Sequence, residues 1–484
     1  MNAQPIDTGP AGEECLNVAE FYRGATVLVT GGTGFIGKVL VEKLLRCFDV
    51  KKIVLLIRRK GNASPADRLH RMLEGPIFDT LRSTVPDAKD RLRRVVAMDS
   101  AFECENIVDD VDKAKLCNEV QIIFHVMASI RFDEELDDAI AMNVTATRRL
   151  YELASAMADL RSIVHVSTFY SNCDKKHIAE RIYDDVPYGG LEHIQHFLKG
   201  LEAPEKQQLT KLVLGTMPNT YVFTKKCAES MIKSTFSELP IGVFRPPIVI
   251  SSYREPEPGW VDCFHGATGL WVPMVLGKTI WYFGEPDCKP FMTPVDQTVA
   301  GMIAAGCDIY RRRSLILPVE KPLPVYNYAF AENAFPFRDY VGLVSSGLAN
   351  PVDRLLSRIR VRISPWRIFP KILLWLMTFQ ARVADEVLAW FGKRGSNVKI
   401  LSAISSLADA VEYFRCRMWT TENGNVRRML ALLSRDDAER LEFDGDRIDW
   451  KDYHKSYAKG IARELMRKNL QRQQHRKSAM AKSS

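Results

Sequence analysis

The chain has 484 residues, of which 46% are hydrophobic and 26% are charged, and its formal net charge is +8. This composition excludes a disordered or collagen-like chain, and the length predicts two or three domains. The ten cysteines form no C-x-x-C pair, which argues against a zinc site or a disulfide framework and suits a reducing compartment.

Both ends of the chain are polar. Residues 1–22 contain no apolar core of the kind found in secretory signals, so we expect a polar leader. Residues 463–484 carry seven Lys or Arg and one Glu, a net charge of +6. A basic tail suits an anionic membrane surface or nucleic acid, and a solvated, disordered tail is the other interpretation.

A glycine-rich turn lies near the start of the chain. Residues 26–29 form a short β-branched run, typical of a buried parallel strand. Gly31, Gly34 and Gly37 follow at the spacing G-x-x-G-x-x-G, and residues 38–46 have helical periodicity. Such a turn lets backbone amides approach a pyrophosphate at the positive end of the helix. The stretch therefore predicts a dinucleotide site, with an ordinary glycine-rich turn as the alternative.

Two further strands follow. Residues 52–57 predict a second buried strand, which ends at Arg58 and two more basic residues. An acidic residue at this position would bind the ribose of NAD, whereas arginine favours the 2′-phosphate of NADP. A basic strand end facing solvent is the alternative. Residues 94–99 predict a third strand, and Asp99 at its end is suited to contact the adenine amino group.

A fourth strand is expected over residues 121–126, followed by small residues that let a cofactor lie close to the sheet. His125, at the end of this apolar strand, is interpreted as structural rather than catalytic. Asn143, within a predicted helix over 136–153, is a candidate for positioning a water or a backbone carbonyl.

Residues 162–170 predict a fifth strand, with Ser167 and Thr168 at its carboxyl end, where ligands bind in open α/β sheets. Residues 241–250 predict a sixth strand, whose two prolines interrupt the ladder near the sheet edge. Because these strands alternate with helical patterns, we expect a doubly wound parallel sheet.

Tyr221 and Lys225 stand one turn apart on one face of a helix predicted over 221–233. A lysine ammonium at this spacing favours the phenolate and would lower the tyrosine pKa toward the working range. The same lysine can hold the nicotinamide ribose. A hydroxyl from Ser167 or Thr168 can bind the substrate oxygen on which charge develops. The alternative is a core tyrosine beside a solvated lysine.

These features resemble the extended short-chain dehydrogenase/reductase superfamily and, more narrowly, the eukaryotic, insect-like fatty acyl-CoA reductases. The likeness extends from about residue 22 to 465. The matching stretches are 27–46, 53–58, 130–136, 164–168, 255–262 and 293–296.

The resemblance implies NADPH-dependent, four-electron reduction of a long-chain fatty acyl-CoA to a primary alcohol with release of CoA. It assigns oxyanion stabilisation to Tyr221 with Thr168 or Ser167, Thr168 being the better match by position, and ribose binding to Lys225. No metal and no nucleic acid are expected. The cofactor-binding residues that it implies are Gly31, Thr33, Gly34, Phe35, Ile36, Gly37, Arg58, Asp99, Val126, Ala128, Lys225, Pro246 and Ile248.

The expected fold is α/β, a doubly wound Rossmann-type sheet with a C-terminal helical domain. The expected parts are a polar leader (1–22), an NADP-binding reductase domain (23–305) with a substrate-side segment (251–300), a connecting region (306–355), a C-terminal helical reductase domain (356–465) and a basic tail (466–484).

The segment 366–391 is the most apolar part of the C-terminal region, but its longest apolar run is too short to span a bilayer. Two interpretations stay open, a helix in the membrane interface and a core-facing helix. Together with the basic tail, the segment suggests peripheral attachment to the endoplasmic reticulum or peroxisome, with a cytoplasmic location as the alternative. The rival functions are a reductase of another lipid, a sterol or a sugar nucleotide, and a cofactor-binding scaffold without turnover.

Overall fold

The computed structural model describes residues 15–264, 266–275, 281–315, 322–339, 362–364, 366, 368–392, 395 and 397–483. Most of the predicted leader and much of the predicted connecting region therefore lie outside the described residues. The chain divides into two compact units. Unit 1 comprises 1–249, 295–331 and 419–445, and unit 2 comprises 250–294, 332–418 and 446–484. The domain bounds expected from the sequence stay a prediction.

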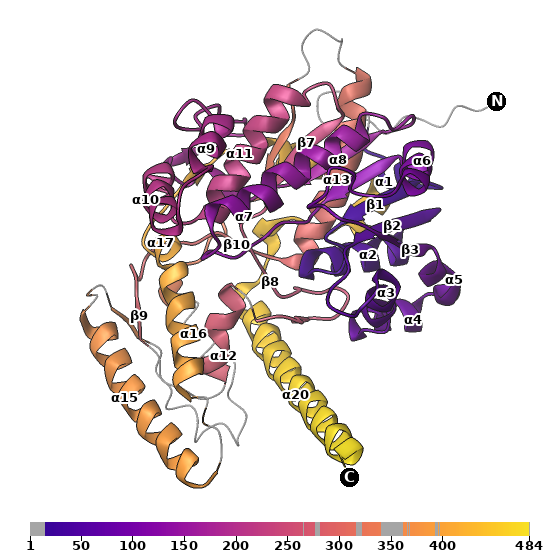
Figure 1. The fold of residues 1–484 in the computed structure, drawn as a ribbon. Coiled ribbons are helices and arrows are strands. Elements are labelled where there is room, and N and C mark those ends of the chain that lie inside the picture. The colour runs from indigo at the N-terminus through magenta and orange to yellow at the C-terminus, as the bar shows by residue number, and fades with distance from the viewer. Residues whose placement is uncertain are drawn as a thin grey trace, which may run out of the picture. The chain divides into compact units, whose positions relative to one another are not determined.

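A seven-stranded sheet forms the centre of unit 1, in the order β11-β7-β5-β4-β1-β2-β3 (Figure 1). Every neighbouring pair is parallel. The strands are β1 Thr26–Thr30, β2 Lys52–Ile57, β3 Val95–Asp99, β4 Ile122–His125, β5 Ser162–Val166, β7 Ile241–Arg245 and β11 Val325–Asn327. The strand order reverses between β1 and β4, and ligands of such sheets bind at this switch point. The predicted fold class is confirmed.

Helices cover both faces of this sheet, so its central strands read as continuous apolar runs. α2 and α13 contact each other on one face, while α8 and α11 both contact a π-helical turn, Ala141–Thr145, on the other. The helices of unit 1 are α1 Val18–Tyr22, α2 Phe35–Cys47, α3 Pro65–Leu73, α4 Asp79–Thr84, α5 Ala88–Arg93, α6 Asp110–Glu119, α7 Leu136–Ile140, α8 Ala146–Ala154, α9 Leu191–Leu198, α10 Ala203–Leu214, α11 Thr220–Thr235, α13 Val295–Leu315, α18 Gly424–Leu432 and α19 Arg435–Arg440.

Beyond β5 the strands differ from the sequence prediction. The predicted strand 241–250 is two strands, because Pro246 and Pro247 supply no N–H for a ladder: β7 ends at Arg245 and β8 spans Ile248–Ile250. β7 is also not an edge strand, since β11 pairs with it. β11 was not predicted from the sequence, because three residues are too few to show an alternation of apolar and polar side chains. Unit 1 also contains a short parallel pair, β6 His177–Ile178 with β13 Thr420–Thr421.

Unit 2 is mainly helical. Among its described residues, the helices are α12 Ala267–Val275, α15 Ile368–Trp390, α16 Asn397–Ala410, α17 Glu412–Arg415 and α20 Trp450–Ser483, and the strands are β9 Trp281–Phe283, β10 Met292–Pro294 and β12 Arg362–Ser364. α15 contacts α16, and α12 contacts both α16 and α20. The loop before α12 packs tightly on α20, where a Cβ at Gly460 would stand only 1.7 Å from the carbonyl oxygen of Gly259. None of the helices described here has both the length and the apolar character that crossing a bilayer requires.

Candidate active site

The glycine turn connects β1 to α2 at the switch point, and its glycines are required by close backbone contacts. Gly31 has a φ of +71°, and a Cβ there would lie 2.8 Å from the amide nitrogen of Met127 in the loop after β4. A Cβ at Gly37 would lie 2.3 Å from the carbonyl oxygen of Gly31. Gly34 is the N-cap residue of α2. The turn therefore keeps backbone amides accessible at the positive end of a helix, which suits a pyrophosphate.

The end of β2 gathers more arginine than the sequence indicated. Arg58 is exposed at the strand end, and Arg68 of α3 donates to its carbonyl oxygen over 2.5 Å. The other terminal nitrogen of Arg68 donates to the Thr33 hydroxyl in the glycine turn over 3.1 Å. Partial burial and the neighbouring charges of Arg58 and Arg71 lower the pKa of Arg68. Cations that repel one another are stabilised by an anion, so this corner is suited to a phosphate group.

Asp99 does not add an unpaired negative charge to this corner. Its carboxylate accepts from Arg59 Nε over 2.8 Å, and both side chains are exposed. The proposed contact of Asp99 with the adenine amino group stays a prediction.

Asn143 connects the loop after β4 to α11. Its side-chain oxygen accepts from the backbone N–H of Ser129 over 2.8 Å, and its amide donates to the Ser129 carbonyl and to the Thr224 hydroxyl. The π-helical turn that contains Asn143 is a rare conformation that often occurs at functional sites. Asn143 thus positions a backbone loop beside the switch point, as one sequence interpretation had it.

Thr168 and Tyr221 meet at the carboxyl end of β5. Asn219 caps α11 by accepting from the Val222 amide over 3.0 Å, so Tyr221 stands in the first turn of the helix. The Thr168 hydroxyl forms a hydrogen bond with the Tyr221 side chain. One turn on, Lys225 Nζ donates to the carbonyl oxygen of Val166 over 2.8 Å. The structure therefore brings together the three residues that the sequence suggested, with Tyr221 half-buried and Lys225 buried.

The pKa of Tyr221 differs from the expectation that Lys225 lowers it. Burial raises the pKa of Tyr221 to about 12, and the hydrogen bond from Thr168 offsets only part of that effect. Burial also lowers the pKa of Lys225 to about 8, so near that pH its ammonium is partly deprotonated and favours the phenolate less than a full charge would. In this arrangement Tyr221 keeps its proton at neutral pH, the form that a proton donor needs.

Ser167 belongs to a different network. Its hydroxyl bonds to the buried carboxylate of Glu229, one turn beyond Lys225 on α11. Arg245 at the end of β7 pairs with the same carboxylate, with Nε 3.0 Å from Oε1 and a terminal nitrogen 2.5 Å from Oε2. Arg245 also donates to the backbone carbonyls of Ala179 and Arg181. This network anchors the helix that carries Tyr221 and Lys225 to the ends of two strands.

His125 is a structural residue, as its position predicted. Its ring nitrogens bond to the hydroxyls of Thr30 and Thr147, over 2.7 and 2.8 Å, and its side chain is fully buried. Burial, with the charge of Lys225, lowers the pKa of His125 to about 3. Burial lowers the pKa of neighbouring His165 as well.

We expect the free energy of unfolding to fall as the pH drops from about 6.5 toward 3. In this window the unfolded His125 binds a proton that the folded chain does not accept, because the folded pKa lies near 3. Denaturant titrations across this range measure the slope. His125→Asn should reduce the slope, whereas His193→Asn, at an exposed position, should leave it unchanged. An unaltered slope in the His125 variant would contradict this assignment.

Comparison with known proteins shows which family the chain belongs to. Models of the family described as "Male sterility protein" match residues 29–302 and 376–468. The "Fatty acyl-CoA reductase wat" of Drosophila melanogaster is 33% identical over 433 residues, which cover 89% of this chain and 82% of that protein. The chain belongs to the fatty acyl-CoA reductase family. The "Fatty acyl-CoA reductase 1" of Homo sapiens is 29% identical over 464 residues, or 94% of this chain and 87% of the human one.

Two solved structures share the fold of this chain. The terminal R domain from the myxalamid PKS-NRPS biosynthetic pathway aligns with a TM-score of 0.57 at 18% identity, covering 91% of each chain. The reductase domain of a nonribosomal peptide synthetase from Mycobacterium tuberculosis aligns with a TM-score of 0.56 at 16% identity, covering 93% of this chain and 95% of that one. At these identities the likeness supports the fold alone, and the chain has an NAD(P)-binding domain of this type.

The other predicted cofactor residues lie around the same edge of the sheet. Phe35 and Ile36 open α2, and Val126 and Ala128 follow β4. Pro246, after β7, accepts from the Phe169 amide over 2.8 Å, and Ile248 opens β8. Their contacts with a cofactor stay predictions.

Sequence reasoning missed Glu229, Arg245 and Arg68. Glu229 continues the four-residue row of Tyr221 and Lys225 along one face of α11, and that spacing is a signal that could have identified it. Arg68 carries no such signal, because only the fold of α3 brings it back to the end of β2.

Proposed function

We propose that this protein uses NADPH to reduce a long-chain fatty acyl-CoA to the primary alcohol, releasing CoA. The observation that carries the proposal is the meeting of Thr168, Tyr221 and Lys225 beside the switch point of the sheet. The relatives named "Fatty acyl-CoA reductase" support the substrate class and align with about nine-tenths of the chain.

The residues at the switch point fit a dinucleotide with a 2′-phosphate. The glycine turn packs so closely on neighbouring backbone that a Cβ at Gly31 or Gly37 would clash, and this tight turn leaves the amides at the start of α2 accessible to a pyrophosphate. Arg58 and Arg68 form the cationic corner beside Thr33. The two arginines would bind the 2′-phosphate of NADPH, whereas NADH, which lacks this phosphate, would gain no affinity from them. Lys225 would bind the nicotinamide ribose hydroxyls.

When bound, NADPH supplies hydride, and two equivalents account for the four-electron change from thioester to alcohol. The hydroxyls of Thr168 and Tyr221 bind the substrate carbonyl oxygen and stabilise the negative charge that develops on it. Loss of the CoA thiolate then gives an aldehyde. Tyr221 binds the aldehyde oxygen in turn and donates its proton to the alkoxide as the second hydride arrives.

Lys225 and the Glu229–Arg245 pair position these hydroxyls. Lys225 lies on α11 one turn after Tyr221. Its Nζ donates to the carbonyl oxygen of Val166, two residues before Thr168, and so connects α11 to the end of β5. The overall balance is one acyl-CoA, two NADPH and two protons consumed, with one alcohol, one CoA and two NADP⁺ formed.

The test is an assay of the purified full chain with NADPH and palmitoyl-CoA. Oxidation of NADPH should accompany free CoA and hexadecanol, two NADPH being consumed for each alcohol. A series of acyl-CoA chain lengths without any alcohol product would contradict the proposal. Binding of NADPH without turnover would favour the cofactor-binding scaffold.

Arg58→Ala and Arg68→Ala should each raise the dissociation constant for NADPH by roughly ten- to a hundredfold and leave that for NADH nearly unchanged. The reason is that only NADPH carries the 2′-phosphate that the cationic corner would bind. Isothermal titration with both cofactors measures the ratio. Arg93→Ala removes an exposed arginine paired with Asp90 and serves as the control. Equal losses of affinity for NADPH and NADH would show that these arginines do not bind the 2′-phosphate.

The domain bounds and the location belong to the same proposal. The reductase domain (23–305) would hold the cofactor, and the substrate-side segment (251–300) with the C-terminal domain (356–465) would hold the acyl chain. Attachment to the surface of the endoplasmic reticulum or peroxisome would place the enzyme where its hydrophobic product partitions.

A further inference from the structure

α15 is an apolar helix that the rest of the described structure leaves uncovered. It spans Ile368–Trp390 without a single buried residue. At 23 residues it is about 35 Å long. The alternative of a core-facing helix, considered from the sequence, is therefore wrong.

The two sides of α15 differ in exposure. Leu373, Leu374, Met377, Ala381 and Leu388 are half-buried, and α15 contacts α16. The opposite side carries a continuous exposed stripe, because its members recur at intervals of three or four residues. The α15 apolar face is defined here by Ile372, Trp375, Leu376, Phe379, Val383 and Trp390.

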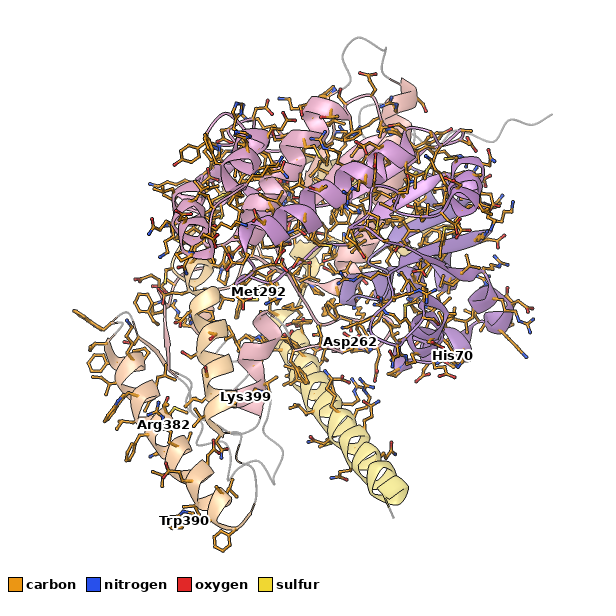
Figure 2. The ribbon with its side chains drawn as sticks, in the orientation of Figure 1. His70, Asp262, Met292, Arg382, Trp390 and Lys399 are labelled. Atoms are coloured by element: carbon orange, nitrogen blue, oxygen red, sulfur yellow. The ribbon has the colours of Figure 1, made fainter. Side chains whose placement is uncertain are left out.

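Large aromatic side chains dominate this face. Trp375 is 66% exposed, Phe379 59% and Trp390 84%. Exposed hydrophobic residues are normal when scattered singly, but a contiguous patch of this length marks an interaction site. Figure 2 shows side chains extending from the side of α15 away from α16, with Arg382 and Trp390 labelled along the helix.

Basic residues flank one edge of the face. Lys371 and Arg382 lie on the same side of the stripe, about 300° and 320° around the helix from Ile368, while the face spans about −20° to 80°. Their long side chains can reach up from the stripe to charged head groups. Asp385 is not available to oppose them, because it accepts from the backbone amides of Asn397 and Val398 at the start of α16. One carboxylate, Glu386, remains in the arc of the stripe.

We propose that the α15 apolar face binds the surface of an anionic lipid bilayer, with the helix axis parallel to the membrane plane. Tryptophans at the level of the head groups, a phenylalanine and aliphatic residues between them, and lysine and arginine at the edge are the features of an interfacial helix. The proposal deepens the proposed attachment to a membrane surface by naming the face that would make it, and it does not depend on the proposed reaction, so its test can fail while acyl-CoA reduction is confirmed.

A second copy of the chain is the other occupant to consider. Interfaces between copies are apolar too, but a single pair of such helices buries little area for a stable dimer. The carboxylates of α15 are Asp385, which bonds to the start of α16, and Glu386, so the two basic residues give the edge of the stripe a positive character. Charge complementarity therefore favours an anionic lipid surface.

Flotation of the full chain with vesicles tests the proposal. Vesicles of phosphatidylcholine with phosphatidylserine should bind the protein more tightly than phosphatidylcholine alone, and raised salt should weaken that difference. The variant Trp375→Asp with Phe379→Asp should bind at least about tenfold more weakly. Leu212→Asp, at a residue of α10 that is 65% exposed, is the matched control and should bind like the wild type.

A second variant separates charge from apolar burial. Lys371→Glu with Arg382→Glu should remove the preference for phosphatidylserine while retaining part of the binding to phosphatidylcholine. Circular dichroism and NADPH titration verify that each variant is folded, because neither depends on α15 touching lipid. Wild-type protein that binds neither vesicle, or a Trp375/Phe379 variant that binds like the wild type, would overturn the proposal. A wild-type dimer that the same variant dissociates, with vesicle binding unchanged, would assign the face to a second copy instead.

Discussion

Tyr221→Phe is expected to lower the turnover number for acyl-CoA reduction by roughly a hundred- to ten-thousandfold. The variant keeps the ring and loses only the hydroxyl, which is bonded to Thr168 and holds its proton because burial raises its pKa to about 12. Steady-state assays with NADPH and palmitoyl-CoA measure the loss. The dissociation constant for NADPH should stay nearly unchanged, because in the proposed mechanism the hydroxyl binds the substrate oxygen and not the cofactor.

Two comparisons sharpen this prediction. Tyr188→Phe removes a hydroxyl from an exposed tyrosine and should leave turnover unaltered. Thr168→Val should also lower turnover, whereas Lys225→Met should weaken NADPH binding in addition, since Lys225 is assigned to the ribose. Retained activity in the Tyr221 variant would show that another group donates the proton.

Arg245→Met is expected to lower the free energy of unfolding by about 3–5 kcal/mol. The substitution leaves the carboxylate of Glu229 buried without its cation, since Arg245 has an exposed side-chain fraction of 0% and Glu229 of 2%. It also leaves the carbonyls of Ala179 and Arg181 without the hydrogen bonds that Arg245 supplies. Urea unfolding followed by circular dichroism measures the change.

A double variant distinguishes the charge effect from the loss of packing. Adding Glu229→Gln to Arg245→Met should recover part of the stability, because position 229 then carries no buried negative charge without Arg245. Lys233→Met, which removes an exposed ion pair with Asp184, should cost less than about 1 kcal/mol. If Arg245→Met costs no more than this exposed control, the buried pair does not anchor α11.

The glycine turn was predictable from sequence, because it is local. Gly31, Gly34 and Gly37 sit within one turn, and the strand before and the helix after them carry their own periodicity. Thr168 and Tyr221 lie 53 residues apart, yet each follows a readable element, so their meeting at the carboxyl edge of the sheet could be expected. The raised pKa of Tyr221 could not be predicted from the sequence. It depends on how far the folded chain removes the hydroxyl from water, and the spacing of residues along the chain does not show that.

Contacts between distant residues were missed for the same reason. Arg68 reaches Thr33 only because α3 folds back over the end of β2, and Arg245 at the end of β7 reaches Glu229 only because α11 packs beside that strand. β11 pairs with β7 from some 80 residues away, in a strand too short to show alternation.

By itself, the sequence determined the order of the strands from β1 to β5, the glycine turn, the Thr–Tyr–Lys set and the likeness to fatty acyl-CoA reductases, because these are carried by contiguous or regularly spaced residues. Only the tertiary structure decided which hydroxyl bonds Tyr221, what neutralises the charge of Glu229, and which side of α15 remains uncovered. Those outcomes depend on burial and on partners that are remote along the chain, and burial exists only once the chain has folded.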